Sequence, residues 1–114
     1  MVNKWDVCYC NLDPTQGSEQ RGARPVLIVS NNAVNHYLPV STVLPISSIK
    51  TDDKLYPSEV LLISSITGLP KDSVAMVQQI RTVAHSRLDK PFCSIEDEEI
   101  REQILKTMRM YFEL

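Results

Sequence analysis

The stretch from Gly17 to Val29 holds the densest group of chemically useful side chains in this chain. Its first half, GSEQRGAR, is polar and supplies a carboxylate, Glu19, and two guanidinium groups, Arg21 and Arg24. Its second half, PVLIV, is a continuous apolar run typical of a strand buried on both faces. A guanidinium is always charged, and its planar fork of donors can hold two phosphate oxygens. The pattern therefore predicts an anion-binding group at the mouth of a rigid strand, beside a polar loop.

Pro25 lies where these two halves meet. Proline lacks a backbone N–H, so Pro25 is predicted to be the first residue of the strand over 25–30. Because Arg24 precedes a proline, it is expected to be extended. A surface ion pair between Arg24 and Glu19 is the structural alternative for the same charges.

Short strands and turns fill most of the remaining chain. Strand composition is found over 5–12, 42–49, 58–63, 73–77, 79–84 and 90–93. Pro45 inside the run 42–49 predicts an edge strand or a bulge. Asn31 to Tyr37 is expected to form a turn or one helical turn, and Ile66 to Lys71 a connector.

The C-terminal segment contains the clearest helix. Ser94 is the predicted N-cap, Asp97 completes an approximate capping box, and the acidic first turn suits the helix dipole. The apolar stripe is expected to pack on the domain's own sheet; it comprises Ile100, Ile104, Leu105, Met108, Tyr111 and Phe112. Many short strands followed by one helix predict a mainly β fold, a small twisted barrel or curled sheet with helices on its rim.

Composition limits the classes of protein to consider. The 114 residues fit one domain over 1–114, and a net charge of −2 argues against a general polyanion binder. Five of the acidic residues crowd 96–102, so the rest of the chain is net positive. Three cysteines, no signal-like segment and no membrane-spanning apolar run favour a reduced, cytoplasmic protein.

The cysteines are expected to be structural. Cys8 and Cys10 are two apart in a strand pattern, so both face one side as small core residues. A zinc site that combines this pair with Cys93, His36 or His85 is the weaker alternative. We therefore expect no metal and no cofactor.

Several strings in a fixed order resemble the MazF/PemK family of toxins. They are LDPTQGSEQ from Leu12, RPVLI from Arg24, KDSVA from Lys71, QIRTV from Gln79 and SRL from Ser86. The resemblance runs from about Val7 to Leu88, and the terminal helix also fits. It implies an SH3-like barrel of the kind shared by MazF and CcdB, with peripheral helices, that forms a homodimer.

The resemblance also implies a function. Family members are metal-independent endoribonuclease toxins that cut single-stranded mRNA at short sequences, leaving a 2′,3′-cyclic phosphate and a 5′-hydroxyl. Their partner is a MazE-type antitoxin whose acidic segment occupies the RNA groove. A non-nuclease toxin of the CcdB type, which inhibits gyrase, and an inactive antitoxin-binding paralogue are the alternatives.

Carried over residue by residue, the family's catalytic arginine falls on Arg24 and its catalytic threonine on Ser47, with Ser48 as the neighbouring candidate. Glu19 matches the loop acid, and the general base stays open; a pair formed by the two histidines is the alternative. The predicted RNA-binding residues are Ser18, Gln20, Arg21, Lys50, Lys54, Tyr56, Gln79, Arg81 and Arg87. The chain departs from the family at Trp5, usually glycine, at Gln78, usually acidic, and in the serine at 47.

Overall fold

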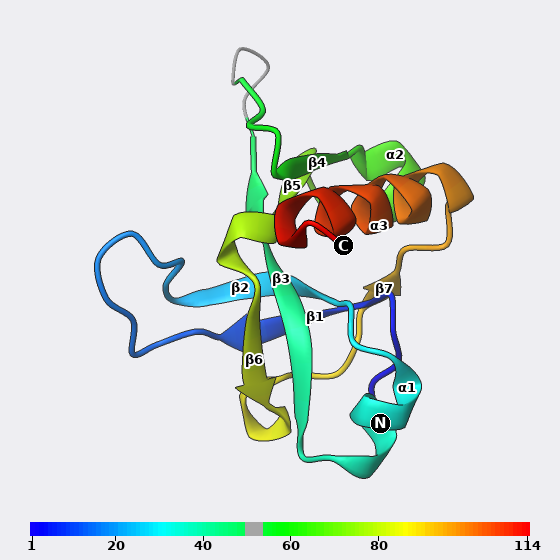
Figure 1. The fold of residues 1–114 in the computed structure, drawn as a ribbon. Coiled ribbons are helices and arrows are strands. Elements are labelled where there is room, and N and C mark those ends of the chain that lie inside the picture. The colour runs from blue at the N-terminus through cyan, green and yellow to red at the C-terminus, as the bar shows by residue number, and fades with distance from the viewer. Residues whose placement is uncertain (50–53) are drawn as a thin grey trace.

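The computed structural model describes residues 1–49 and 54–114 (Figure 1). Its strands are β1 (Asp6–Asn11), β2 (Ala23–Ile28), β3 (Val40–Ser48), β4 (Glu59–Leu62), β5 (Ser73–Met76), β6 (Arg81–Ala84) and β7 (Cys93–Ser94). Its α-helices are α1 (Asn32–Tyr37), α2 (Ser64–Thr67) and α3 (Glu98–Phe112), and two 3₁₀ turns are η1 (Val77–Gln79) and η2 (His85–Arg87).

All paired strands are antiparallel, and β3 is the strand around which the others are ordered. The sheet order is β4-β5-β3-β2-β1-β7, and β6 pairs with the first half of β3. A single bridge between Cys10 and Leu88 joins β1 to the segment after β6, which closes β1, β2, β3 and β6 into a small barrel. The predicted mainly β fold, an SH3-like barrel with peripheral helices and a terminal helix, is therefore confirmed.

The sheet has a separate core on each face, because successive strand residues point to opposite sides. Inside the barrel lie Val2, Cys8, Cys10, Leu12, Val26, Ile28, Val43 and Val83. The opposite face buries Val7, Leu27, Leu44, Ile46, Val60, Leu62, Ala75, Ile95 and, from α3, Ile104. Figure 1 shows α3 lying across the β4–β5 end of the sheet. The two faces predicted for β1, with Val7 on one and Cys8 and Cys10 on the other, are confirmed.

Two predictions about prolines were wrong. Pro45 lies in a central strand, not at an edge or in a bulge, and it is paired with Val26 of β2 in an unbroken register. On its other side β3 changes partner at this point: β6 pairs up to Val43 and β5 begins at Ile46. Pro45 therefore lies between the two ladders, where a missing N–H costs least. Pro25 is the third residue of β2 rather than its first, just before the pairing with β3 begins.

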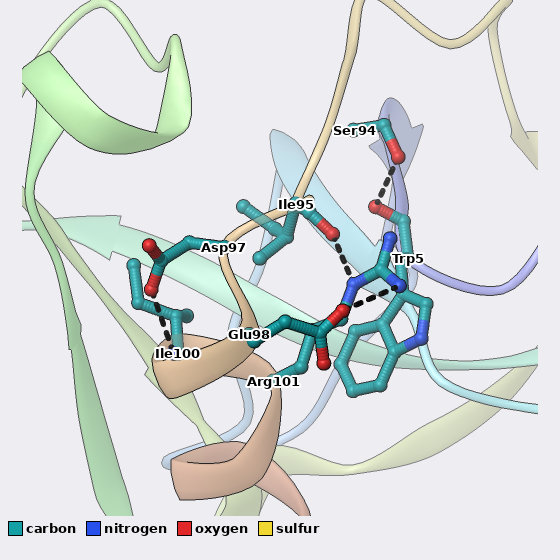
Figure 2. A network of polar contacts seen from close by, with 7 residues as sticks. All are labelled: Trp5, Ser94, Ile95, Asp97, Glu98, Ile100 and Arg101. Atoms are coloured by element: carbon teal, nitrogen blue, oxygen red, sulfur yellow. Dashed lines mark hydrogen bonds and ion pairs between the residues drawn. The ribbon is translucent and has the colours of Figure 1, made fainter.

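The ends of the helices also differ from expectation. Asp97, not Ser94, caps α3, since its Oδ2 accepts from the Ile100 N–H at 3.0 Å. Ser94 belongs to β7 and donates to the Trp5 carbonyl at 3.3 Å (Figure 2). The predicted connector after β4 contains α2, which ends at Gly68 with φ of 81°, a backbone conformation that suits glycine.

The apolar stripe of α3 packs on the sheet only in part. Ile104 is fully buried, and Ile100, Leu105 and Met108 pack against the core beneath it. Tyr111 and Phe112 are about half exposed and contact each other edge to face, with ring centroids 5.1 Å apart. The prediction that the whole stripe is buried was therefore wrong for the last turn, which lies beyond the core contacts.

Trp5 lies where the family that the sequence resembles is expected to have glycine, and its backbone has a conformation that suits glycine. Its φ is 78°, a conformation that normally favours glycine. The indole is 9% exposed and contacts two cations, with Lys4 Nζ and the Arg101 guanidinium each 5.2 Å from the ring centroid. Arg101 also donates to the Ile95 carbonyl at 2.6 Å (Figure 2). Burial and cation–π contacts thus offset the backbone strain and fasten α3 to the start of β1.

Replacing Trp5 should separate these two effects. Trp5→Ala is expected to lower the free energy of unfolding by about 3–5 kcal/mol, because the buried indole is lost. Trp5→Gly should be more stable than Trp5→Ala by about 1 kcal/mol, since only alanine keeps the positive-φ strain. At a site with negative φ alanine would be the more stable of the two. Urea unfolding of both variants measures this difference. A higher free energy of unfolding for Trp5→Ala than for Trp5→Gly would contradict the backbone strain at Trp5.

Candidate functional site

The loop between β1 and β2, residues 12–22, is held in shape by its own hydrogen bonds. Its ends are joined by the Leu12 N–H to the Gly22 carbonyl, 3.0 Å, and by the Gly22 N–H to Asp13 Oδ1, 3.1 Å. At the tip, Glu19 Oε1 accepts from the Gln16 N–H at 2.6 Å. Gly22 has φ of 80°, which a residue with a Cβ would rarely adopt. The polar loop predicted from the sequence is therefore an ordered scaffold.

Side chains from β6, η1 and η2 bind the backbone of this loop. Gln79 accepts from the Gln20 N–H at 3.2 Å and donates to the Ser18 carbonyl at 3.1 Å. Arg81 donates to the Leu12 carbonyl at 3.1 Å, and Arg87 donates to the carbonyls of Asn11 and Asp13. The predicted RNA-binding residues Gln79, Arg81 and Arg87 thus first of all position the loop. Each guanidinium has five N–H donors, so these bonds leave others free for a ligand.

A cavity of about 330 Å³ lies where β2 begins, beside this loop. Among the described residues its wall carries three cationic side chains, Arg21, Arg24 and Lys71, and no carboxylate; the other lining residues are Tyr9, Ala23, Pro25, Ile46, Ser48, Leu69, Pro70 and Ser73. Arg24 is half-buried, and its Nε donates to the Arg21 carbonyl at 2.8 Å, which fixes the guanidinium. Three cationic groups beside serine hydroxyls are the chemistry of a phosphate site.

Asp72 follows Lys71, one of the lining residues of this cavity, and is itself bound to α2. Its carboxylate accepts from the Ser64 N–H at 2.8 Å, which caps α2 from outside the helix. The bonds with Ser64 lower the pKa of the Asp72 carboxyl below its usual value. Asp72 therefore stays ionised in the neutral range and keeps Lys71 and Pro70 in place along the cavity.

Ser47 and Ser48 lie on opposite faces of β3. Ser48 is exposed and lines the cavity with Arg24, whereas Ser47 is half-buried and does not line it. The β2–β3 register pairs Val26 with Pro45, and its extension by two residues sets Ser47 opposite Arg24 on the same face. Cavity lining favours Ser48 and strand register favours Ser47, so both remain candidates for the reactive hydroxyl.

Glu19 lies beside a second, smaller cavity rather than against Arg24. This cavity of about 170 Å³ is lined by Glu19, Gln20, Pro45, Gln78, Gln79, Ile80 and Arg81. In the described part of the chain Arg24 and Glu19 form no ion pair, and the one salt bridge found there joins Arg101 to Glu98. The ion-pair explanation of these two charges is therefore wrong.

Gln78 accounts for another departure from the family. Its Nε2 donates to Glu59 Oε2 at 3.3 Å, and its Oε1 accepts from Ser58 Oγ at 2.8 Å. An acidic residue at this position would lose the donated bond and face the Glu59 carboxylate. An amide is consequently the better partner for Glu59 at the start of β4.

The remaining predicted residues lie away from the Arg24 cavity. Ser18 contributes its carbonyl to the loop scaffold, and Lys54 and Tyr56 are exposed outside both cavities. Lys50 falls outside the residues that the structure describes. His36 Nε2 lies 2.7 Å from Asn3 Oδ1, and His85 Nε2 lies 2.7 Å from Ser41 Oγ. Neither imidazole lines the Arg24 cavity.

The cysteines behave as core residues. Burial raises the pKa of the Cys8 thiol to about 12, and it also raises the pKa values of Cys10 and Cys93. All three thiols therefore stay protonated near neutral pH and are poor nucleophiles and metal ligands. Within residues 1–49 and 54–114, no three His, Cys, Asp or Glu side chains are grouped so that they could hold a metal ion.

Sequence reasoning missed the polar residues Tyr9, Lys71 and Ser73 of the cavity wall, as well as its apolar members from β3 and the segment before β5. Lys71 and Ser73 belong to the KDSVA string, which was noted only as a family motif. The sequence offered less indication that Tyr9 belongs to the site. The strand pattern shows only that Tyr9 lies on the opposite face from Cys8 and Cys10. The fold brings these polar residues to Arg24 from three places: Tyr9 from β1, Ser73 from the start of β5, and Lys71 from the turn before β5.

The fold and the site define a class: an SH3-like barrel with peripheral helices and a cationic cavity beside an ordered loop. Residues 3–111 match the model of one family, described as PemK-like, MazF-like toxin of type II toxin-antitoxin system. The chain belongs to this family and is an endoribonuclease toxin of the MazF type. Within the described residues no helix is both long and apolar enough to cross a membrane.

Individual relatives agree with this assignment. The chain is 37% identical over 102 residues to the endoribonuclease MazF of Staphylococcus saprophyticus, covering 90% of this chain and 84% of that protein. The crystal structure of MazF from Deinococcus radiodurans has a TM-score of 0.83 at 21% identity and covers 99% of this chain and 97% of that one. An endoribonuclease in complex with its cognate antitoxin, from a mycobacterial species, has a TM-score of 0.80 at 20% identity, covering 100% and 97%.

Proposed function

We propose that this protein cleaves single-stranded mRNA at short sequences without a metal ion, leaving a 2′,3′-cyclic phosphate and a 5′-hydroxyl. The observation that carries the proposal is the group of three cations, Arg21, Arg24 and Lys71, that line one cavity. Three cations can neutralise the charge that a metal ion would otherwise offset at the phosphate. The 2′-hydroxyl of the substrate then acts as the nucleophile, so the protein need not supply one.

Arg24 takes the electrostatic role in this mechanism. Its backbone bond to Arg21 leaves the terminal nitrogens of the guanidinium to contact the phosphate oxygens as negative charge builds up. Arginine hardly deprotonates in proteins, so Arg24 stays a cation that donates hydrogen bonds and does not serve as the general base. Ser47 would polarise or position the phosphate through its hydroxyl. Glu19 would accept a proton through the carboxylate oxygen that does not bind Gln16. Because it lies beside the smaller cavity and not against Arg24, the general base stays open.

The surrounding loop would bind the rest of the RNA. Arg21 lines the Arg24 cavity, and Gln20, Gln79 and Arg81 line the smaller one. Ser18 and Arg87 lie on or against the loop backbone, and Lys54 and Tyr56 extend the surface on the side of β4. Backbone phosphates would supply most of the affinity, which makes binding strongly dependent on salt. We also include Lys50 among the proposed RNA-binding residues, on the basis of its position in the sequence alone.

The cations that would bind RNA would also bind an acidic protein partner. We propose a MazE-type antitoxin whose acidic, extended segment competes with RNA for the cations around Arg24. MazE–MazF complexes are known among the structural neighbours from Deinococcus radiodurans. A homodimer in the cytoplasm completes the proposal, and the exposed apolar residues Met110, Tyr111 and Phe112 on α3 are available for such an interface.

Cleavage in the presence of a chelator tests the proposal. A long RNA incubated with the protein in excess EDTA should give the same fragments as without EDTA, each downstream fragment beginning with a 5′-hydroxyl. Direct labelling by polynucleotide kinase, without phosphatase, detects that end. Arg24→Ala protein purified in parallel controls for a contaminating nuclease. Loss of cleavage in EDTA, with recovery on adding Mg²⁺, would show that the cationic cavity does not replace a metal.

A further inference from the structure

Two aromatic rings lie stacked on the surface next to the Arg24 cavity. The ring centroids of Tyr9 and Phe92 are 4.8 Å apart with an interplanar angle of 24°, and each side chain is 40% exposed. The backbone holds them there: the Phe92 N–H donates to the Val7 carbonyl at 3.0 Å, and the Asp89 N–H donates to the Tyr9 carbonyl at 2.9 Å. The pair is thus an ordered aromatic surface rather than two mobile side chains.

Tyr9 forms part of two cavities, whereas Phe92 lines neither of them. The first is the Arg24 cavity, and the second, of about 320 Å³, is lined by Tyr9, Cys10, Asn11, Asp13, Ala23, Ser86, Arg87 and Asp89. Phe92 therefore covers one side of the Tyr9 ring and leaves another side facing the cavities. No hydrogen bond joins the Tyr9 hydroxyl to any side chain or backbone group in the described ranges 1–49 and 54–114.

We propose that Tyr9 stacks on the base of a nucleotide next to the phosphate held by Arg24, and that Phe92 is the positioning residue that supports its ring. This subsite rests on the proposed function, because it takes the same RNA. A base and its own phosphate are joined through one sugar, so they must bind in neighbouring cavities, and Tyr9 belongs to both. An exposed, rigid aromatic face suits a base, because every base offers a π face.

Fluorescence of 2-aminopurine in a non-cleavable RNA tests this subsite. The RNA carries a 2′-O-methyl group at the cleaved nucleotide, and 2-aminopurine replaces one neighbouring base at a time. Wild-type protein should quench the fluorescence at one position next to the cleavage site. Tyr9→Ala should abolish that quenching and weaken RNA binding by about tenfold or more, which is the range for one lost base–aromatic stack. Tyr9→Phe should retain both.

Two further variants separate stacking from folding. Tyr9→Leu keeps an apolar contact with Phe92 but has no π face, so it should lose quenching while its urea unfolding stays close to that of Tyr9→Phe. Tyr37→Ala removes a tyrosine that is 85% exposed on α1 and should change neither signal. Wild-type quenching and affinity in Tyr9→Ala or Tyr9→Leu would overturn the subsite alone. Absence of RNA binding and cleavage in wild type would overturn the proposed function and the subsite together.

Discussion

Arg24→Ala is expected to lower the rate of RNA cleavage by about a hundredfold or more, the usual effect of removing one donor that stabilises transition-state charge. The guanidinium lies in a cavity with two other cations, and its own Nε is bound to the Arg21 carbonyl. Arg21 and Lys71 remain in the variant, so RNA binding should fall much less than the rate. Single-turnover cleavage with saturating protein measures the rate separately from binding.

Arg24→Lys should recover only part of the lost rate, because a point charge cannot hold two phosphate oxygens as the planar fork does. Arg109→Ala is the matched control, since Arg109 is an exposed arginine on α3 outside the Arg24 cavity. Arg24→Ala should fold normally, because its side chain donates only one bond, to a loop carbonyl. A folded Arg24→Ala protein that cleaves at the wild-type rate would rule out this role and direct attention to His36 and His85.

Local pattern was enough to predict most of the fold. The alternation in 5–12 and the apolar run from Pro25 predicted strands, because side chains in a strand must match the two faces of a sheet. The position of Pro45 could not be predicted in the same way. A proline is tolerated in this central strand because the pairing partner of β3 changes there from β6 to β5. Such a change depends on the tertiary fold and leaves no signal in the local sequence.

The ends of helices were also set by tertiary contacts. Ser94 and Asp97 are both good caps, and the sequence alone favoured the first. In the fold Ser94 is taken into β7 beside the start of β1, so the cap passes to Asp97 (Figure 2). The short α2 was missed because its cap comes from Asp72 in the following loop, not from its own N-terminal residue.

The candidate site was predicted where its residues are neighbours in the sequence and missed where they are not. Arg21 ends the loop and Arg24 lies three residues on, in β2, so their shared cavity could be expected from spacing. Lys71 comes from the turn before β5 and Tyr9 from β1, and only the sheet order brings them together. Gln79 and Arg81 were predicted as ligand contacts, but the structure shows first that they bind the loop backbone.

Ser47→Ala is expected to lower the rate of cleavage by about tenfold to a hundredfold, the effect of losing one hydrogen bond to a charged group. The β2–β3 register, extended from Val26 and Pro45, sets this serine opposite Arg24. RNA binding should change little, because the cationic side chains supply most of the affinity. Ser47→Thr should be tolerated, since threonine keeps the hydroxyl and suits a strand.

Ser48→Ala is the matched control for this prediction, and it should change the rate by less than about threefold if its hydroxyl makes no hydrogen bond in the transition state. The contrary expectation rests on the cavity, which Ser48 lines and Ser47 does not. The cleavage rates of Ser47→Ala and Ser48→Ala on one RNA, measured at saturating protein, decide which serine supplies the hydroxyl. Strand register favours Ser47, and cavity lining favours Ser48. Damage confined to Ser48→Ala would move the catalytic hydroxyl by one residue. Wild-type rates in both variants would leave Arg24 without a hydroxyl partner on β3.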